Sequence, residues 1–441
     1  MSLVNPSILP GFMELLPDEQ KAFNRIKNII EKNFIKYGFV NIDTPLIEKE
    51  EILLSKGGGE TSKQIYRIDK ESTPQALRFD LTVSLARYVA MHANELNFPF
   101  KRYQIGKVYR GERNQKGRYR EFYQCDIDII GNDNLSIYND AEMPAVIYEI
   151  FKDLGFENIT FRINNRKLLG GFLESIEVSD FENILRTIDK LEKIGEEKTY
   201  LELEKLNISK ENIEKIFNFI KINQSNEETI EKLKNTNIDN ELFINGLNEL
   251  EQTYKFMKLF GVPEKNIKID LTITRGLDYY TGMVFETFLN GYENIGSVCS
   301  GGRYDDLANN FTKKKYPGVG LSIGLTRLFY QLNEAGLLEK DKELNDAILV
   351  VPMNEDIIEY SIDIVNKLRK RNINSDIYLE NGKIKKKFTY ADRLNVKYAI
   401  ILGESEKNEN KISIKNFITG NQESIDFNDL DKYINGGNKW K

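Results

Sequence analysis

The strongest structural signal in the chain is the stretch Lys107-Val-Tyr-Arg-Gly-Glu-Arg-Asn-Gln-Lys-Gly-Arg-Tyr-Arg-Glu-Phe-Tyr-Gln-Cys-Asp-Ile-Asp-Ile129. Its first half places six cationic side chains around two glycines. The planar fork of arginine suits phosphate oxygens, and glycine leaves a loop free to close on a ligand. Its second half alternates with period two, which puts Gln124, Asp126 and Asp128 on one face of a strand. We expect an antiparallel hairpin over residues 100–130, with either an anionic ligand held between loop and carboxylates or a half-exposed strand whose polar face meets water.

Patterns on either side of this hairpin predict more of the layout. Residues 18–37 have the spacing of an amphipathic helix, and residues 39–45 form a short extended segment ended by proline. Residues 171–261 are rich in Lys, Glu, Asn and Ile at helical spacing, which indicates a small helical region with solvated charged faces. Further strands are expected at 267–273, 282–289 and 296–300. A glycine-punctuated segment at 318–325 then leads into a helix that carries Arg327.

Composition bounds the class of protein. The chain has 441 residues, which suggests about three domains. It carries 62 Lys and Arg against 68 Asp and Glu, and its 40% of hydrophobic residues can form a large core. No apolar run approaches the roughly 18 residues of a membrane-spanning helix, and no secretory signal opens the chain. With one histidine, His92, and two cysteines, the composition excludes Ser-His-Asp catalysis, multi-histidine metal sites and a disulfide framework. We expect a cytoplasmic protein that does not contact membranes.

Two further segments could bind a small molecule. Residues 274–282 combine an arginine, an aspartate and two tyrosines between glycines. This set either lines a pocket for a small polar molecule or forms a turn whose aromatic rings pack on the sheet. Residues 57–62, Gly-Gly-Gly-Glu-Thr-Ser, suggest a phosphate loop but lack the GxxxxGK[ST] order. We expect a mobile loop there.

Five motifs together resemble the histidyl-tRNA synthetase family of class II aminoacyl-tRNA synthetases. Residues 110–122 look like motif 2 of that class, residues 320–327 like motif 3, and residues 38–45 like motif 1. The segments Arg275-Gly-Leu-Asp-Tyr-Tyr280 and Ser300-Gly-Gly-Arg-Tyr-Asp305 are similar to two signatures specific to the family. The resemblance covers essentially the whole chain.

The resemblance implies a fold and a reaction. The expected fold is an α+β catalytic core built on an antiparallel sheet, with a helical insertion domain and a C-terminal α/β anticodon-binding domain. The expected reaction joins L-histidine to ATP, giving histidyl-adenylate and pyrophosphate, and then transfers the histidyl group to the 3′ end of tRNA(His). Because the substrate's own carboxylate attacks the α-phosphorus, the protein needs only to position the reactants and stabilise charge. ATP implies Mg²⁺ in the substrate complex, for which the sequence identifies no protein ligands.

The resemblance also assigns roles to individual residues. The catalytic groups are expected to be Arg110 at the α-phosphate, Arg275 at the reacting carboxylate, and Arg327 at the ATP tail. Glu112 and Arg118 match further ATP contacts. Phe122 matches the aromatic ring stacked on adenine. The expected histidine-binding residues are Asp80, Thr82, Gln124, Asp128, Arg275, Tyr279, Tyr280 and Tyr304.

Within this pocket, Asp128 and Tyr280 match the residues that read the imidazole ring. The Asp80-Leu-Thr82 and Cys125-Asp-Ile-Asp128 forms resemble the archaeal and eukaryotic-type branch of the family, because the other bacterial branch tends to have Glu at positions 80 and 128. Aspartate at position 128 shortens the reach toward the imidazole by one methylene. Gln115 and Arg120 are expected to approach the acceptor end of the tRNA.

The expected domains are a catalytic core in two parts (1–170 and 263–338), a helical insertion (171–262) and an anticodon-binding domain (346–441). In the last domain the apolar run 347–352 and the alternating helices and strands after it indicate a parallel sheet. Its basic clusters, 367–371 and 383–387, either bind RNA phosphates or form solvated helix faces. The motif 1 resemblance implies a homodimer.

Two alternatives stay open at this point. One is a non-catalytic paralogue similar to the regulatory subunit of ATP phosphoribosyltransferase in histidine biosynthesis. Such proteins resemble the core but usually lack the anticodon-binding domain and lose motif arginines, whereas this chain has Arg110, Arg275 and Arg327. The other is an RNA-binding scaffold without turnover, which would not need complete ATP and amino-acid pockets.

Overall fold

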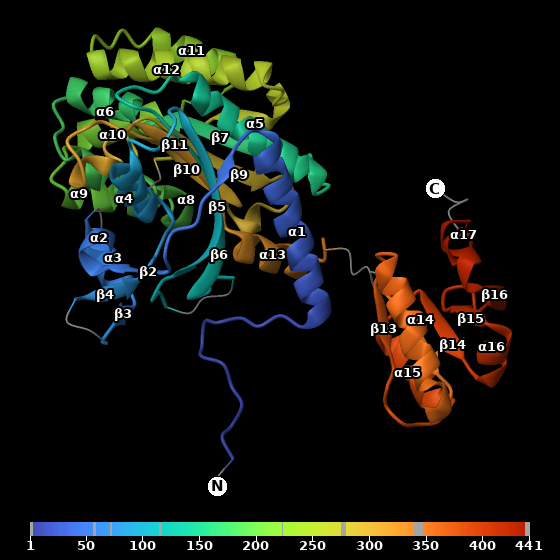
Figure 1. Cartoon of the computed structure of the whole chain (residues 1–441). Helices are drawn as coiled ribbons and strands as arrows, with labels where there is room; N and C mark the ends of the chain where they lie inside the picture. The colour runs from blue at the N-terminus through green and yellow to red at the C-terminus, as the bar shows by residue number, and fades with distance from the viewer. Residues whose placement is uncertain are drawn as a thin grey trace. The chain divides into compact units, whose positions relative to one another are not determined.

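The computed structural model describes residues 3–55, 59–70, 73–113, 117–222, 224–274, 279–338 and 347–436. The chain forms two compact units, residues 1–338 and residues 339–441, which Figure 1 colours from blue to orange and from orange to red. In the described part of the chain, no helix combines the length and the apolar character needed to cross a membrane.

An eight-stranded sheet forms the centre of the first unit (Figure 1). In order across the sheet, its strands are β1 (Val40–Asn41), β5 (Phe100–Tyr109), β6 (Glu121–Ile130), β11 (Gly318–Ile323), β10 (Cys299–Tyr304), β9 (Met283–Leu289), β7 (Ile159–Asn165) and β8 (Ile267–Ile269). The neighbours from β5 to β7 are all antiparallel, and only the two edge pairs are parallel. The predicted α+β core on an antiparallel sheet is therefore confirmed.

Hairpin β5–β6 is confirmed, and its alternation separates two faces of the sheet. Cys125 and Ile127 pack in the main hydrophobic core together with α1 (Pro17–Lys36) and α5 (Tyr138–Asp153). Asp126 and Asp128 point to the opposite face and are only 3% and 2% exposed. The alternative of a polar face in water is therefore wrong. The carboxylates are buried because other segments cover this face of the sheet.

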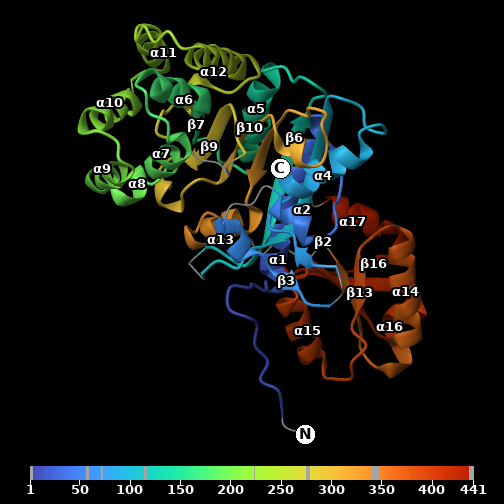
Figure 2. The same ribbon diagram turned by 90° about the vertical axis from the view of Figure 1, so that its left-hand side faces the viewer.

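Helices follow β7 in the stretch where they were expected. They are α6 (Arg166–Ser175), α7 (Phe181–Ile188), α8 (Leu191–Ile194), α9 (Glu196–Lys205), α10 (Lys210–Ile220), α11 (Asn226–Lys234) and α12 (Glu241–Leu259). Figure 2 shows α9, α10 and α11 on the side of this unit that lies away from α1. Ser225 and Glu228 cap α11 reciprocally, as their spacing predicts. The buried faces of these helices, for example Ile184 in α7 and Ile216 in α10, pack in the same hydrophobic core as the sheet.

A small sheet, β2 (Ile47–Lys49), β4 (Gln75–Leu77) and β3 (Arg67–Ile68), lies beside α4 (Thr82–His92). The glycine-rich segment here differs from the expectation of a mobile loop, because residues 59–64 form helix α3 (Gly59–Gln64); residues 57 and 58 lie outside the described residues. Ile65, directly after α3, packs with Leu53 and Phe79, which anchors this short helix despite its glycine.

Two of the expected strands are shorter or shifted. The strand expected at 267–273 ends at Ile269. The strand expected at 296–300 begins only at Cys299, because residues 293–295 form a 3₁₀ turn, η2 (Glu293–Ile295), and Gly296 has a positive φ of 77°. The glycine-punctuated segment is strand β11, followed by α13 (Leu325–Glu334).

The second unit contains a five-stranded sheet in the order β13 (Ser375–Ile377), β12 (Ile348–Pro352), β14 (Tyr398–Leu402), β15 (Lys411–Asn416), β16 (Gln422–Asp426). The first three strands are parallel, as expected, and α14 (Ile358–Lys370) and α15 (Ile384–Arg393) connect them. The antiparallel strands β15 and β16 were not predicted. Lys387 in the second basic cluster is buried and donates to the carbonyl of Pro352 at 2.6 Å, so it does not face RNA.

Candidate active site

A cavity of about 1040 Å³ lies on the polar face of the eight-stranded sheet. Residues from the loop between β5 and β6, the start of α4 and the start of α13 line it together. Among them are ten of the residues expected from the sequence: Asp80, Thr82, Arg110, Glu112, Arg118, Phe122, Gln124, Tyr279, Tyr280 and Arg327. The structure thus brings the expected ATP and amino-acid residues to one site.

The cross-strand register builds the floor of this cavity. Asp126 of β6 pairs with Gln104 of β5 and with Ser322 of β11, and Ser322 pairs with Ser300 of β10. The next row along the strands places Asp128 beside Gly320. Because glycine has no side chain, the carboxylate of Asp128 can lie flat over β11, where an added Cβ would be 2.7 Å from Asp128 Cγ. Ser300 and Ser322 therefore line the floor, while Gly320 leaves room for the carboxylate of Asp128 beneath it.

The cavity has two unsatisfied acceptors, one just before α4 and one on β6. Asp80 is buried, and its Oδ1 accepts a hydrogen bond from the backbone of Val83 at 3.0 Å. Its Oδ2 and the Oε1 of Gln124 have no hydrogen-bond partner among the described residues. Burial raises the pKa of Asp80 to about 6, and the nearby charge of Arg110 partly offsets that rise. These two oxygens fit a cationic donor such as a protonated amine.

Below the cavity lies a buried charged group. Tyr304 donates to Asp128 Oδ1 at 2.6 Å, and Arg102 lies 2.5 Å from Asp128 Oδ2. Burial raises the pKa of Asp128 to about 7, although Arg102 opposes the shift. Neither Asp128 nor Tyr304 reaches the cavity surface. They support it from beneath, through the ring of Tyr279, whose centroid is 6.2 Å from that of Tyr304.

The other end of the cavity is cationic. Arg110 donates from Nε to the carbonyl of Phe79 at 3.0 Å, and its guanidinium lies 5.1 Å from the ring centroid of Phe122. Arg118 lies 3.6 Å from Glu112, and Arg327 donates to the carbonyl of Ile295 at 3.2 Å. Three arginines and an aromatic ring at one end suit a triphosphate and a flat base.

Five of the expected residues are not at the cavity or cannot be placed. Asp128 and Tyr304 were expected to bind histidine directly but lie beneath the cavity, and the other three are Arg120, Gln115 and Arg275. Arg120 is directed away from the cavity: its Nε donates to the carbonyl of Glu112 at 3.1 Å, and its backbone N–H donates to Gly11 at 2.6 Å. Gln115 and Arg275 lie outside the described residues, as do residues 276–278 of the first family signature. In the part of the chain that the structure describes, no three His, Cys, Asp or Glu side chains are grouped as a metal site.

Several lining residues were missed in the sequence. They come from α6, α7 and the turn after it, from α3, and from the sheet and α13: Lys63, Arg166, Glu182, Arg186, Asp189, Lys190, Glu286, Ser322 and Gln331. The helical members had been interpreted as solvated charges, since helical spacing alone does not show which charged face meets a cavity. For Ser322, the period-two alternation of β11 with Gly320 was an available signal.

Comparison with known proteins identifies the family. The family model described as histidyl-tRNA synthetase matches residues 11–328, and the model described as anticodon binding domain matches residues 347–436. The histidine–tRNA ligase of Clostridium tetani (strain Massachusetts / E88) is 58% identical over 433 residues, which is 98% of each chain.

Two solved structures share the fold. Histidyl-tRNA synthetase from Nostoc sp. PCC 7120 is 40% identical, has a TM-score of 0.86, and covers 98% of this chain and 100% of its own. An ATP phosphoribosyltransferase regulatory subunit/histidyl-tRNA synthetase from Bacillus halodurans C is 20% identical with a TM-score of 0.74, covering 88% of this chain and 97% of its own, and shows the fold alone. On the full-length match to the family, the chain belongs to the histidyl-tRNA synthetase family.

Proposed function

We infer that the chain is a histidine–tRNA ligase: it activates L-histidine with ATP to histidyl-adenylate and transfers the histidyl group to the 3′ end of tRNA(His). The 58% identity to a histidine–tRNA ligase over nearly the whole of both chains supports this function. So does the cavity, which has cationic side chains at one end and buried carboxylates at the other. The match of residues 347–436 to an anticodon-binding domain disfavours the regulatory paralogue, and the cavity lined by the expected ATP and amino-acid residues disfavours a scaffold without turnover.

The observation that carries the amino-acid half of the proposal is the pair of unsatisfied acceptors. Asp80 Oδ2 and Gln124 Oε1 are buried without hydrogen-bond partners in the described structure. A buried acceptor left unpaired is costly, so a ligand that donates to both oxygens gains affinity when it binds. The ammonium group of an amino acid is such a donor, and Thr82 completes this cradle. Tyr280 then recognises the imidazole ring, and Asp128 contributes from beneath the cavity, where Tyr304 donates a hydrogen bond to it.

The phosphate half follows from the arginines. With the amino group held at Asp80, the substrate carboxylate faces the end of the cavity where Arg110 and Arg327 lie. Arg110 stabilises the α-phosphate as charge develops on it, while Arg327 and Arg118 hold the rest of the triphosphate. Phe122 stacks on adenine and Glu112 makes a further ATP contact. Arg275 neutralises charge at the reacting carboxylate.

Mg²⁺ enters this reaction as part of the substrate complex with ATP. It would supply positive charge to the phosphate oxygens, and the protein would add its arginines at the same oxygens. The carboxylates of Glu112 and Glu286 at the cavity wall have the oxygen chemistry that Mg²⁺ accepts. Since Mg²⁺ is usually bound through one or two carboxylates together with substrate phosphates, ATP itself would provide most of the coordination.

For the tRNA, the domain boundaries guide the proposal. Residues 1–170 and 263–338 form the catalytic core, residues 171–262 are the helical insertion, and residues 346–441 bind the anticodon. Exposed lysines of the second unit contact RNA phosphates there. Gln115 and Arg120 approach the acceptor end, a role for Arg120 that requires its present bonds to Gly11 and Glu112 to open.

A homodimer and a cytoplasmic location complete the proposal. Ile35, Val40 and Ile47, in and beside the motif 1 stretch, are large apolar side chains with about half of their surface exposed, and β1 is an edge strand of the sheet. Such a surface suits association with a second copy. The substrates, tRNA and ATP, and the two free buried cysteines suit the cytoplasm.

The Asp80 and Asp128 forms lead us to propose an archaeal and eukaryotic-type pocket, although the relatives from Clostridium tetani and Nostoc are bacterial and give that assignment no support.

The function is tested by aminoacylation. The purified chain is incubated with ATP, Mg²⁺, total tRNA and labelled histidine, and the charged tRNA is then sequenced. The proposal expects one charged species, tRNA(His), and no charging without ATP. Charging of several tRNAs, or of none by folded protein, would contradict it.

A further inference from the structure

We propose that Asp140, Arg303, Asp305 and Thr281, here called the Arg303 clamp, position Tyr280, which reads the imidazole ring of the substrate, and Tyr304, which supports the pocket from beneath. The inference rests on the proposed function and adds residues that do not touch substrate. None of the four lines the cavity. They therefore act as positioning residues, through Tyr280 and Tyr304.

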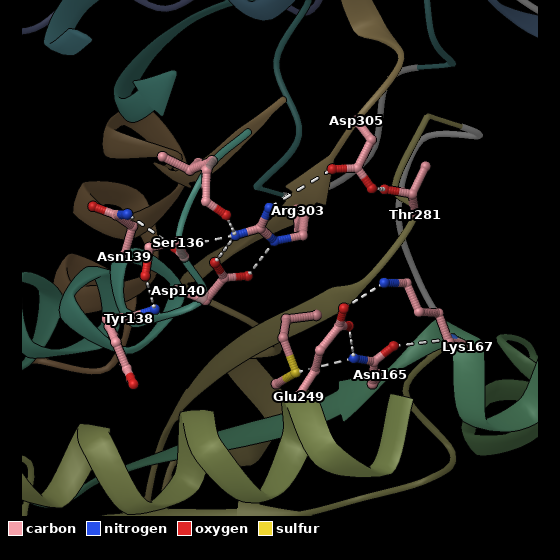
Figure 3. Close-up of polar contacts among 12 residues, drawn as sticks. Ser136, Tyr138, Asn139, Asp140, Asn165, Lys167, Glu249, Thr281, Arg303 and Asp305 are labelled. Carbon is pink, nitrogen blue, oxygen red and sulfur yellow. Dashed lines mark hydrogen bonds and ion pairs between the residues drawn. The ribbon is translucent and has the colours of Figure 1, made fainter. Parts of the chain in front are cut away.

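The first part of the clamp is a buried ion pair. Arg303 donates from Nε to Asp140 Oδ1 at 3.1 Å and from its second terminal nitrogen to Oδ2 at 2.6 Å. Only 7% of the Arg303 side chain and none of Asp140 is exposed. The same arginine donates to the carbonyls of Leu135 and Ser136 at 3.2 and 3.3 Å, so its fork is held on several sides (Figure 3).

A buried ion pair of this kind is weak evidence for stability, because removing two charges from water costs about as much as their attraction returns. Geometry is the better reason for it. Arg303 belongs to β10, whereas Asp140 belongs to α5, far away in the chain. The pair therefore locks the end of β10 onto a helix of the core. Tyr304, the next residue of β10, is held with it.

The second part of the clamp connects β10 to the neighbouring signature. The backbone N–H of Thr281 donates to the carbonyl of Arg303 at 2.8 Å, and its hydroxyl donates to Asp305 Oδ2 at 2.6 Å. Asp305 Oδ1 lies 3.7 Å from Arg303 Nη1. Figure 3 marks this ion pair. Thr281 follows directly after Tyr280. Both tyrosines thus adjoin residues that the clamp holds.

The opposite side of Thr281–Gly282 is also fixed. The carbonyl of Gly282 accepts from the backbone of Arg166 at 3.0 Å, and an added Cβ at Gly282 would lie 3.0 Å from Arg303 Cδ. Next to it, Asn165 donates to Glu249 of α12 at 2.7 Å, in the second network of Figure 3. Polar contacts therefore hold Thr281 and Gly282 on both sides. A small shift of Arg303 moves Tyr280 and Tyr304 together.

The test separates positioning from general stability. Thr281→Val removes the hydroxyl donor but keeps the shape of the side chain at a partly buried position. Asp140→Asn keeps the shape but removes the charge that holds Arg303. Glu142→Gln is the control: it lies on the same helix and breaks an ion pair of similar length but greater exposure, to Lys101 at 2.7 Å, which does not touch the clamp.

Pyrophosphate exchange is measured at varied histidine and at varied ATP, with thermal unfolding recorded for each variant. Because a small misplacement of a binding group costs one to two orders of magnitude, we expect KM for histidine to rise about ten-fold or more in Thr281→Val and in Asp140→Asn. KM for ATP should change less than about two-fold, since the clamp lies away from the triphosphate end, and Glu142→Gln should leave both constants unchanged.

Equal changes in the two KM values, or an unchanged KM for histidine in Thr281→Val, would overturn the inference. If Asp140→Asn fails to fold, Thr281→Val carries the test alone. A failure of the proposed function looks different, because the unmodified chain would then show no histidine-dependent exchange.

Discussion

Replacing Gly320 with alanine should weaken histidine activation although no charged or catalytic residue is itself substituted. Gly320 lies beside Asp128 across the sheet, and a Cβ at position 320 would be 2.7 Å from Asp128 Cγ and closer still to Oδ1. Carbon atoms in ordinary contact lie about 3.5 Å apart or more. The carboxylate must therefore move by about 0.8 Å or more.

That movement is large compared with the bonds that hold the carboxylate. Asp128 Oδ1 accepts from Tyr304 at 2.6 Å, and a shift of that size places the two oxygens beyond the usual O–H···O range. A lost hydrogen bond to a charged group costs about 1.5–3 kcal/mol. If this loss falls on substrate binding, kcat/KM for histidine decreases by about 10- to 200-fold, since about 1.4 kcal/mol is a factor of ten.

The assay is pyrophosphate exchange at varied histidine, with ATP saturating. The matched control is Gly382→Ala in the second unit, where an added Cβ meets only the flexible end of Lys386 at 3.3 Å. The control should keep wild-type kinetics. A folded Gly320→Ala variant with kcat/KM for histidine within two-fold of the unmodified chain would refute the account of the cavity floor.

Three further predictions follow from the same site and the second unit. The Asp80→Asn variant should be more stable than the unmodified chain at high pH. Burial raises the pKa of Asp80 from 3.8 to about 6, so the stabilisation that the protonated carboxyl contributes is full below about pH 4. This stabilisation is lost as the pH rises to about 6. The difference in Tm between variant and unmodified chain should therefore grow over that window and stay level above pH 7, and histidine-dependent exchange should be lost. In Arg110→Lys, which lacks the planar fork, exchange should fall roughly 10²- to 10³-fold with little change in Tm. In Lys387→Met, the lost bond to Pro352 should lower the free energy of unfolding by about 1–3 kcal/mol in a urea titration, whereas Lys385→Glu on the exposed face should weaken tRNA binding and reduce its salt dependence.

The antiparallel core could be predicted because its signal is local. Alternation in residues 122–129 is enough to assign a strand and its two faces, and apolar spacing is enough to assign α1 and the helices between β7 and β8. Strand β15 was missed although Lys411-Ile-Ser-Ile-Lys415 alternates with period two, because so short a run is a weak signal, and β16 has only one apolar residue, Ile425, to mark it. Helix α3 was missed because the packing of Ile65 outweighs the local preference of its glycine-rich start.

The candidate site was predictable only as far as motifs name its residues. The cavity contains ten of the residues that the family resemblance assigns. The partners beneath it were not predictable, since Arg102 meets Asp128, and Asp140 meets Arg303, only through the register of the sheet and the packing of α5. The charged residues of α7 were also missed, because a solvated helix face and a cavity wall have the same local pattern.

The most direct test of the central claim is ATP–pyrophosphate exchange with each of the twenty amino acids supplied separately. The account predicts exchange with histidine only, because Asp80 and Gln124 hold any amino group, while Tyr280, supported from beneath the cavity by Asp128 and Tyr304, selects the imidazole. Exchange with a different amino acid would contradict that assignment, and no exchange from folded protein with Mg²⁺ present would contradict the ligase function itself.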